Sequence, residues 1–259
     1  MATKYDDPDN PLLHLDKPPL KRGYLTDQET VDATGLQVAS LRMLQAAGAV
    51  RAISAPKQHG GFRRMWPVID VYKAAVAGAM AEDYQWNITI AGKVVAKLQD
   101  SLWQGLEITA QKVDPADDHF TYDNLYMGAG KMDWFFELVN RKLLFLVVPK
   151  PLMPTLGLSS PLIPLGLVKK DDFTSAPWIP DYGPKRDKVL EKADKEKLPR
   201  VEAMIKHLRS GYDRYRSRTS LNISMVVRAA QRRANGLPTA YILDSAEDIF
   251  LADEGGPEE

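Results

Sequence analysis

The sequence contains no cysteine among its 259 residues. Disulfide scaffolds, thiolate metal sites and cysteine nucleophiles are therefore excluded. There is no net charge either, because 34 basic side chains balance 34 acidic ones. Apolar residues make up 44% and charged residues 26%, which is ordinary for a globular protein and argues against wholesale disorder.

Features of secretion and membrane insertion are also missing. Asp6, Asp7 and Asp9 occupy the place where a secretory leader carries positive charge, and this favours a cytoplasmic protein. The uncharged run Pro151–Val168 has the length of a transmembrane helix, but four prolines interrupt it. Because most of these prolines would break a helix, we expect a buried irregular segment or a docking surface there, and no membrane partner.

Patterns typical of an active site are absent as well. The sequence has no phosphate-binding loop, no Gly-x-Ser-x-Gly and no His-Glu-x-x-His. The four histidines are scattered, and His119 beside Asp117 and Asp118 is more typical of a solvated acidic turn than of a metal site. The sequence thus predicts neither an enzyme nor a bound cofactor or metal.

Charge is present but segregated along the chain. Residues 185–243 hold 15 basic and 6 acidic side chains, whereas residues 244–259 hold seven acids and no base. Between Arg51 and Trp66 there are four basic side chains and one histidine, with no acid. Local fields of this kind indicate binding partners better than the overall charge does. The segment 51–66 is therefore either a solvated loop or a surface for a polyanion.

The most informative pattern lies in residues 24–80. Thr26 and Glu29 have the spacing of a capping box, which predicts the start of a short helix. Gly35 allows a tight turn after it, and apolar residues at helical spacing predict a second helix that ends near Ala47. Two short helices joined by a glycine-containing turn are typical of a helix-turn-helix.

A basic hairpin and a third helix complete this unit. Val50–Ser54 and Phe62–Trp66 are predicted strands that flank the loop Ala55–Gly61. Pro67 suits the first position of a third helix, where its missing N–H would be unpaired anyway. The order helix, turn, helix, basic hairpin, helix is that of a winged helix-turn-helix.

This stretch resembles the MerR family of bacterial DNA-binding regulators. The resemblance covers residues 24–80, roughly a fifth of the chain. The segments that carry it are Tyr24-Leu25-Thr26, Thr34-Gly35-Leu36, Ser40-Leu41-Arg42, Ala47-Gly48-Ala49-Val50 and, above all, Gly61-Phe62-Arg63-Arg64-Met65-Trp66. The chain departs from the family at Ala39 and Met43, where polar or aromatic readers are usual, and it lacks the metal-sensing cysteines.

The resemblance implies two sets of DNA contacts. Polar side chains of the second helix would reach base edges in the major groove, and these are Gln37, Ser40, Arg42 and Gln45. Basic side chains of the hairpin region would contact phosphates, and these are Arg51, Lys57, Arg63 and Arg64. Because neighbouring residues of a strand point to opposite faces, we expect at least one of the two adjacent arginines to face DNA.

The rest of the chain predicts further helices and one more hairpin. Asn87–Leu102 has the apolar spacing of an amphipathic helix that belongs to the core or to a dimer seam. Asp133–Val139 and Lys142–Val148 flank Asn140-Arg141 as the strands of a two-residue β-hairpin. Helices are also predicted for Asp187–Arg209 and, capped by Ser220, up to about Asn235.

Arginines gather around the last of these helices. They form either a second nucleic-acid surface or a face that pairs with the acidic tail. The side chains concerned are Arg214, Arg216, Arg218, Arg228 and Arg232.

Taken together, these patterns predict the α+β class, with an N-terminal winged helix-turn-helix, a mixed helix and β-hairpin domain, and a C-terminal helical segment. The expected divisions are a flexible arm (1–20), a DNA-binding domain (21–85), a middle domain for dimerisation or an effector (86–175), a basic helical region (176–243) and an acidic tail (244–259). We expect a bacterial sequence-specific transcription regulator that binds double-stranded DNA as a homodimer, with RNA polymerase as a further candidate partner. Two alternatives stay open: a phage or mobile-element DNA-handling protein of the excisionase or packaging type, and a winged-helix protein–protein adaptor.

Overall fold

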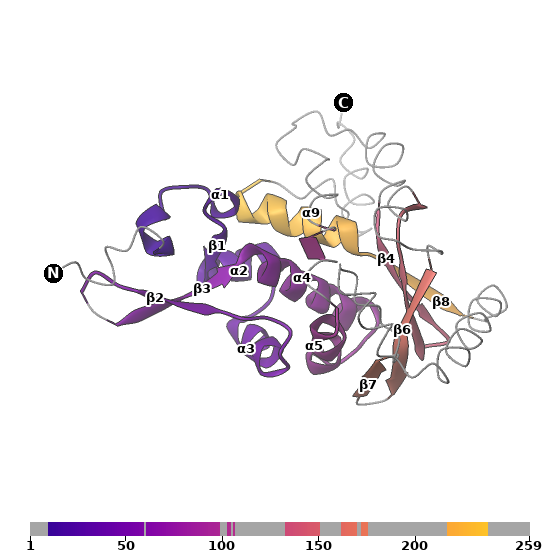
Figure 1. Cartoon of the computed structure of the whole chain (residues 1–259). Helices are drawn as coiled ribbons and strands as arrows, with labels where there is room; N and C mark the ends of the chain where they lie inside the picture. Colours follow the sequence, from indigo (N-terminus) through magenta and orange to yellow (C-terminus); the bar gives the residue numbers. More distant parts are fainter. Residues whose placement is uncertain are drawn as a thin grey trace, which may run out of the picture.

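A computed structural model gives the fold of the chain and describes residues 10–59, 61–98, 103–104, 106, 133–150, 162–169, 172–175 and 217–237. Helices and two antiparallel sheets make up this part of the chain, so the predicted α+β class is confirmed. Figure 1 shows a small sheet and short helices at the N-terminal end, a larger sheet at the opposite end, and helices between them. The predicted helix Asp187–Arg209 and the acidic tail lie outside the described residues.

The N-terminal half contains helices around a three-stranded antiparallel sheet of order β1-β3-β2. In chain order its elements are η2 (Pro11–His14), α1 (Pro19–Arg22), β1 (Tyr24–Thr26), α2 (Asp27–Thr34), α3 (Val38–Ala46), β2 (Ile53–Pro56), β3 (Phe62–Pro67), α4 (Val68–Asp83) and α5 (Ile88–Ala96). Helix α5 is shorter than the predicted Asn87–Leu102. No helix in the described residues combines the length and apolar character that a bilayer crossing requires.

The predicted capping box is present at the start of α2. The hydroxyl oxygen of Thr26 accepts from the backbone N–H of Glu29, and the Glu29 carboxylate accepts from the backbone N–H of Thr26 at 2.7 Å. Gly35 ends the helix with a φ of 70°, a left-handed conformation that glycine adopts without strain. Helix α3 follows after a short turn, with Gln37 as its N-cap residue.

Part of the predicted flexible arm has a defined structure from Asn10 onward. The side chain of Asn10 is buried, and its amide nitrogen donates to the backbone oxygen of Pro56 at 3.1 Å. Its side-chain oxygen caps η2 by accepting from the N–H of Leu12. The segment is thereby attached to the end of strand β2.

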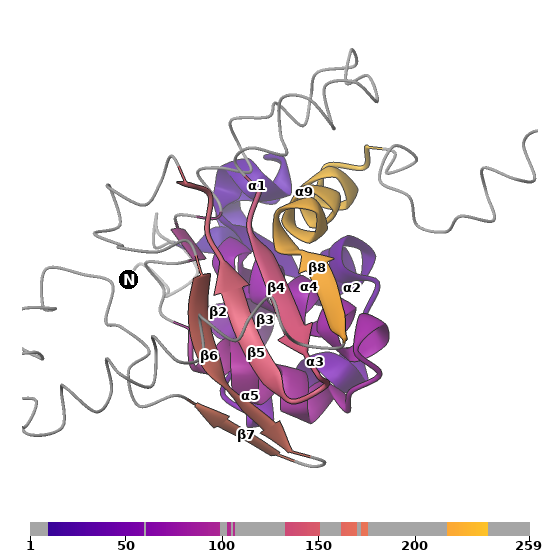
Figure 2. The same cartoon turned by 90° about the vertical axis from the view of Figure 1, so that its right-hand side faces the viewer.

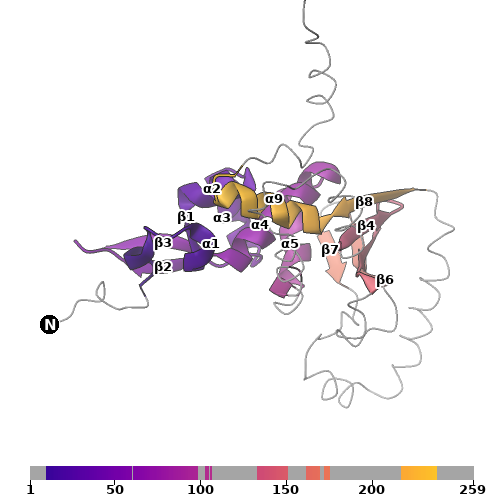
Figure 3. The same ribbon diagram turned by 90° about the horizontal axis from the view of Figure 1, so that it is seen from above.

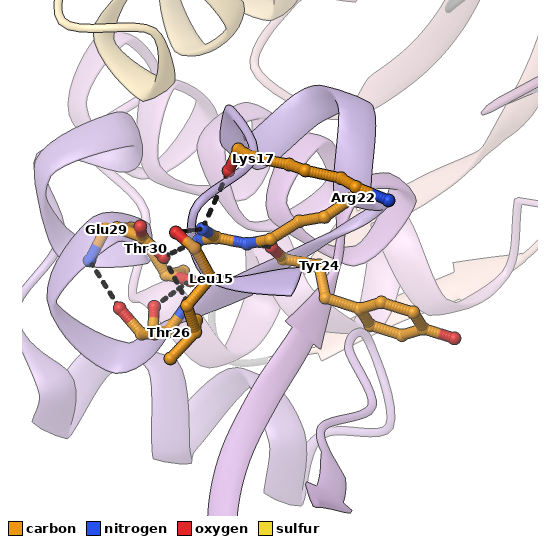
Figure 4. A network of polar contacts seen from close by, with 7 residues as sticks. All are labelled: Leu15, Lys17, Arg22, Tyr24, Thr26, Glu29 and Thr30. Atoms are coloured by element: carbon orange, nitrogen blue, oxygen red, sulfur yellow. Dashed lines mark hydrogen bonds and ion pairs between the residues drawn. The ribbon is translucent and has the colours of Figure 1, made fainter. Parts of the chain in front are cut away.

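Arg22 holds the other end of this segment. Its side chain is 1% exposed and forms an ion pair with Glu29 of α2. Figure 4 shows the same guanidinium group among backbone oxygens of the preceding turn and of β1, where it donates to Leu15, Lys17 and Tyr24. One buried cation thus connects η2, β1 and the N-terminus of α2.

Helix α4 lies at the centre of the molecule and is buried on most of its circumference. Many of its buried residues are alanine or valine, so neighbouring helices approach closely. Gly92 of α5 faces α3, where an added Cβ would lie 3.0 Å from a methyl group of Leu44. Gly78 of α4 lies equally close to Leu36 in the turn before α3. These contacts determine how deeply α3 sits against the core.

The second sheet has five antiparallel strands in the order β7-β6-β5-β4-β8. They are β4 (Phe135–Val139), β5 (Leu143–Val147), β6 (Leu162–Lys169), β7 (Asp172–Ser175) and β8 (Arg218–Asn222), and Figure 2 shows them in front of the helices. The predicted hairpin between β4 and β5 is confirmed. Three residues, Asn140 to Lys142, separate the paired Val139 and Leu143, one more than in the predicted two-residue connection. Asn140 and Arg141 have positive φ values of 51° and 56° in this turn, and the N–H of Lys142 donates to the oxygen of Val139.

Strand β6 corrects the expectation for Pro151–Val168. From Leu162 onward this segment is a paired strand, and only the part before it lies outside the described residues. Pro164 pairs with Phe145 where the β5–β6 register shifts between Leu144 and Phe145. Because proline cannot donate to a ladder, an irregularity of this kind lets it occupy an interior strand.

Helix α9 (Ile223–Ala234) returns from β8 across the helices and packs against α2 and α4. Figure 3 shows it lying along them. Its N-cap is Asn222, whose side chain accepts from the N–H of Met225 at 3.0 Å, so the prediction of Ser220 as the cap is wrong. Ser220 instead lies in β8.

The apolar core is continuous from the N-terminal helices to the second sheet and α9. The hydroxyl of Tyr84, at the end of α4, donates to the backbone oxygen of Phe136 in β4 at 2.9 Å. The amide of Gln231 in α9 donates to the hydroxyl of Tyr72 in α4 at 3.1 Å. The core therefore runs across the expected domain boundary at residue 85.

A buried ion pair overturns part of the predicted second basic surface. Arg228 and Asp133 are 3% and 5% exposed, and their side chains meet at 2.5 Å. Arg232 is buried as well, because α9 turns this side toward the molecule. Arg218 remains exposed in β8, at 3.9 Å from Glu137, whereas Arg214 and Arg216 lie outside the described residues.

We expect Arg228→Met to reduce the free energy of unfolding by about 3 kcal/mol, because it leaves the Asp133 carboxylate buried without its cation. Urea denaturation at pH 7 measures this loss. Arg218→Met is the matched control, because the Arg218 side chain is about half exposed and its ion pair with Glu137 is long, at 3.9 Å, and it should change stability by less than about 0.5 kcal/mol. Equal effects of the two substitutions would contradict the buried pairing.

Candidate nucleic-acid interface

Helix α3 has one buried and one exposed side. Leu41 and Leu44 are fully buried, which anchors the helix to the core at helical spacing. The predicted base-reading residues Gln37, Arg42 and Gln45 are exposed, and Ser40 is half-buried. Ala39 and Met43 are exposed on the same helix. The helix is therefore accessible, and its accessible side mixes polar and apolar groups.

The hairpin of β2 and β3 projects beyond the helices (Figure 1). Its loop is closed by a hydrogen bond from the N–H of Lys57 to the oxygen of Gly61, and Gly61 has a φ of 77°. Lys57, His59 and Arg63 are exposed. With no acid between Arg51 and Trp66, the end of the hairpin has a positive field.

Strand alternation separates the two adjacent arginines. Arg63 pairs with Ala55, whereas Arg64 pairs with Ser54, so their side chains leave opposite faces of the hairpin. Arg63 is exposed on its face. Arg64 shares its face with Trp66, and its guanidinium lies 5.4 Å from the centre of that indole ring.

Asp27, the first residue of α2, accepts hydrogen bonds from this face of the hairpin. Arg64 donates to both carboxylate oxygens at 2.9 Å, and the indole N–H of Trp66 donates at 2.7 Å. A bidentate pair of this kind fixes orientation as well as distance. The structure thus engages Arg64 internally, and the exposed member of the predicted pair is Arg63.

The electrostatics of Asp27 connect the hairpin to α3. The hydrogen bond from Arg64 is the main cause that holds the pKa of Asp27 below its usual value, against the opposing effect of burial. The charge of Arg42 on α3 lowers the same pKa. Asp27 in turn raises the pKa of Arg64. Two guanidinium groups, one from α3 and one from β3, therefore share the field of a single carboxylate.

Glu29 is a second carboxylate near the start of α2. Burial alone would raise its pKa, but the hydrogen bonds from Arg22 and from Thr26 outweigh this effect and leave the pKa below its usual value. Its partners are the capping residue and the buried cation of the N-terminal segment. Glu29 therefore connects α2 to the N-terminal segment, whereas Asp27 connects α2 to the hairpin.

Arg51 lies between α3 and the hairpin. Its side chain is exposed, and its backbone N–H donates to the carboxylate of Asp70 in α4 at 3.1 Å.

Sequence reasoning found the exposed cations but missed Asp27 and Arg22 as organising residues. The only local signal for Asp27 is an acid in the first turn of a helix, since its partners lie 37 and 39 residues away.

Neither metal ligands nor known relatives add to this picture. Among the described residues, no three histidine or acidic side chains gather to hold a metal ion. His119 and its acidic neighbours lie outside those residues. No protein-family model, curated protein or solved structure matches the chain. The functional argument therefore depends on the geometry of α3, the hairpin and Asp27.

Because the folded-state pKa of Asp27 is lowered, its ionised form stabilises the fold above its unfolded pKa, and this contribution disappears as pH falls through the folded pKa. We expect Asp27→Asn to cost about 1 kcal/mol at pH 7, since both partners are partly exposed. The difference from wild type should shrink between about pH 5 and pH 2. Urea denaturation at each pH tests this.

Asp32→Asn serves as the control on the same helix. Asp32 is exposed and accepts a hydrogen bond from Gln28, which an asparagine can also accept. Its substitution should leave the pH dependence of stability close to that of wild type. A parallel pH profile for Asp27→Asn and wild type would show that the Arg64 pair contributes nothing to stability.

Proposed function

We propose that the chain is a sequence-specific, DNA-binding transcription regulator of bacterial type, and that residues 21–85 form a winged helix-turn-helix. The element order β1-α2-α3-β2-β3-α4 and the antiparallel sheet β1-β3-β2 support this interpretation. The observation that carries it is the acid-free basic hairpin that belongs to the same unit as α3, which exposes Gln37, Arg42 and Gln45, with Arg64 of the hairpin paired to Asp27 at the start of α2.

In this proposal α3 enters the major groove. Gln37, Arg42 and Gln45 reach base edges, where glutamine can pair with adenine and arginine with guanine. The half-buried Ser40 lies on the same helix, with less of its surface available to DNA. This arrangement assigns sequence choice to one exposed helix face.

The hairpin supplies affinity rather than sequence choice. Lys57 and Arg63 contact phosphates from its exposed end, and Arg51 does so from its base. Arg64 has a different role, because its pair with Asp27 holds the hairpin against α2.

The protein acts as a homodimer on an inverted repeat, since a two-fold dimer presents two copies of α3 to two half-sites. RNA polymerase is the partner that a promoter-bound regulator of this kind would meet.

Loss of hairpin cations should weaken binding to every sequence. We expect Lys57→Ala and Arg63→Ala each to reduce affinity and to lower the slope of log affinity against log salt by about 1. Fluorescence anisotropy measures both, with a duplex selected by the wild-type chain from a random pool and with an unrelated duplex of equal length. Unchanged affinity and slope in the double variant would refute the assignment of the hairpin.

Changes in α3 should instead alter sequence preference. We expect Gln37→Ala to reduce discrimination at one base pair of the selected duplex by about 1–3 kcal/mol, with little effect on the unrelated duplex. Competition binding with single-base variants of the selected duplex measures this. A uniform loss on all sequences would place Gln37 on the backbone rather than on a base.

Removal of the negative charge at Asp27 should strengthen binding. The amide oxygen of asparagine can still accept from Arg64 Nε and from the Trp66 indole, whereas the bond from Arg64 Nη2 to the second carboxylate oxygen is lost and the interface gains one net positive charge. We expect Asp27→Asn to bind the selected duplex more tightly and with a steeper salt dependence. Asp32→Asn is the control for charge elsewhere on α2. Weaker binding by a folded Asp27→Asn would show that the carboxylate does not face the duplex.

A protein–protein adaptor is the second candidate, favoured by the exposed apolar residues Ala39 and Met43 on α3. Absence of binding to any duplex at low salt would favour it. A phage or mobile-element DNA-handling protein predicts a third result, in which the random pool yields bound DNA without a common motif. The same selection experiment therefore separates all three functions.

A further inference from the structure

The hairpin carries one apolar side chain that its fold does not cover. Phe62 is 63% exposed, more than any other large apolar residue in the described part of the chain. It begins strand β3 at the end of the hairpin, opposite Pro56. Exposure of most of an aromatic ring to water is unfavourable, so the ring is a candidate contact for a partner.

Strand alternation gives the direction of this side chain. Phe62, Arg64 and Trp66 leave the same face of β3, and the latter two contact Asp27 at the start of α2. Arg42 of α3 acts on the same carboxylate. Phe62 therefore lies on the hairpin face that turns toward α2 and α3, farther along the strand than the Asp27 contact.

The surroundings of Phe62 favour a polyanionic partner. Lys57, His59 and Arg63 are exposed near it, and the segment 51–66 contains no acid. The bonds of Arg64 and Trp66 to Asp27 hold the strand below it in place, so little ordering is needed on binding. An apolar ring among cations matches a DNA groove, which has phosphate rims and stacked bases within.

We propose that Phe62 is a wedge that enters the minor groove and partly unstacks one base step, while α3 lies in the neighbouring major groove. This inference rests on the proposed DNA-binding function and extends it to deformation of the duplex. It assigns the hairpin two tasks, since cations hold the phosphates and the ring selects for a step that opens easily. Pyrimidine–purine steps are the ones that deform most readily.

The test uses the full chain and duplexes selected by it from a random pool. 2-Aminopurine, whose fluorescence rises when it unstacks, replaces one base at a time beside the conserved part of the selected site. We expect a rise at one step with wild type and with Phe62→Leu, and none with Phe62→Ala. We also expect Phe62→Ala to bind about ten-fold more weakly with an unchanged salt slope, because no charge is lost.

Leu167→Ala is the matched control, since Leu167 is an exposed large apolar side chain in β6, outside the helix and hairpin proposed to bind DNA. It should leave the 2-aminopurine signal in place. Thermal melting should show that both variants fold, as expected for exposed positions. A wild-type complex without any unstacked base, or a Phe62→Ala complex with an unchanged signal, would overturn the wedge while DNA binding itself stands. Failure of the wild-type chain to bind any duplex would instead overturn the proposed function, and the wedge with it.

Discussion

The carboxylate of Asp27 is the constraint on which the candidate interface depends. It lies at the first position of α2, where the unpaired N–H groups and the helix dipole favour a negative charge. Three hydrogen bonds from β3 end on it, and they come from a guanidinium and an indole that are stacked together. Strand β3 also pairs with β1, which runs directly into α2, so backbone pairing and these side-chain bonds together set the direction of the hairpin relative to α2.

The Asp27 contact also divides the side chains of β3 into those on the face toward Asp27 and those on the opposite face. Residues on the Asp27 face are either engaged in the fold, as Arg64 and Trp66 are, or placed beyond it on the side of α3, as Phe62 is. Arg63 leaves the other face and stays exposed. The two adjacent arginines thereby differ: Arg64 positions the hairpin, and Arg63 adds positive charge to its surface. The alternation of a strand is sufficient to produce this difference.

Elsewhere, polar contacts specify how the halves of the chain meet. Apolar surfaces of alanine, valine and leucine can pack against each other in many relative positions. Polar pairs such as Gln231 with Tyr72 and Arg228 with Asp133 form in only one of these positions. Tyr84 adds a bond from α4 to the second sheet, and burial raises the pKa of its hydroxyl. A protonated hydroxyl is what donation to the backbone oxygen of Phe136 requires. These contacts tie the helices of the candidate interface to the sheet and to α9.

Short-range rules were sufficient for a large part of the fold. The Thr26–Glu29 capping box, the turn at Gly35 and the Asn140-Arg141 hairpin could all be predicted, because each depends on residues a few positions apart. Exposure of Gln37, Arg42, Gln45 and Lys57 followed from helical spacing and from a hairpin without acids. Ser220 as a cap was wrong because the neighbouring Asn222 provides one after the strand has ended.

Only the tertiary structure decided which arginines are available. Arg64 meets Asp27 across 37 residues and Arg228 meets Asp133 across 95, and no local pattern indicates such partners. Pro164 lies in a strand because the β5–β6 pairing skips the neighbouring Leu165, an irregularity that appears only when β6 is aligned with β5. The sequence by itself determined α2, the turn after it, α3 and the hairpin of β4 and β5, since their energies are local, but it did not indicate strand β6 or the start of α9. The partner of each charge depends on which distant elements a shared core brings together.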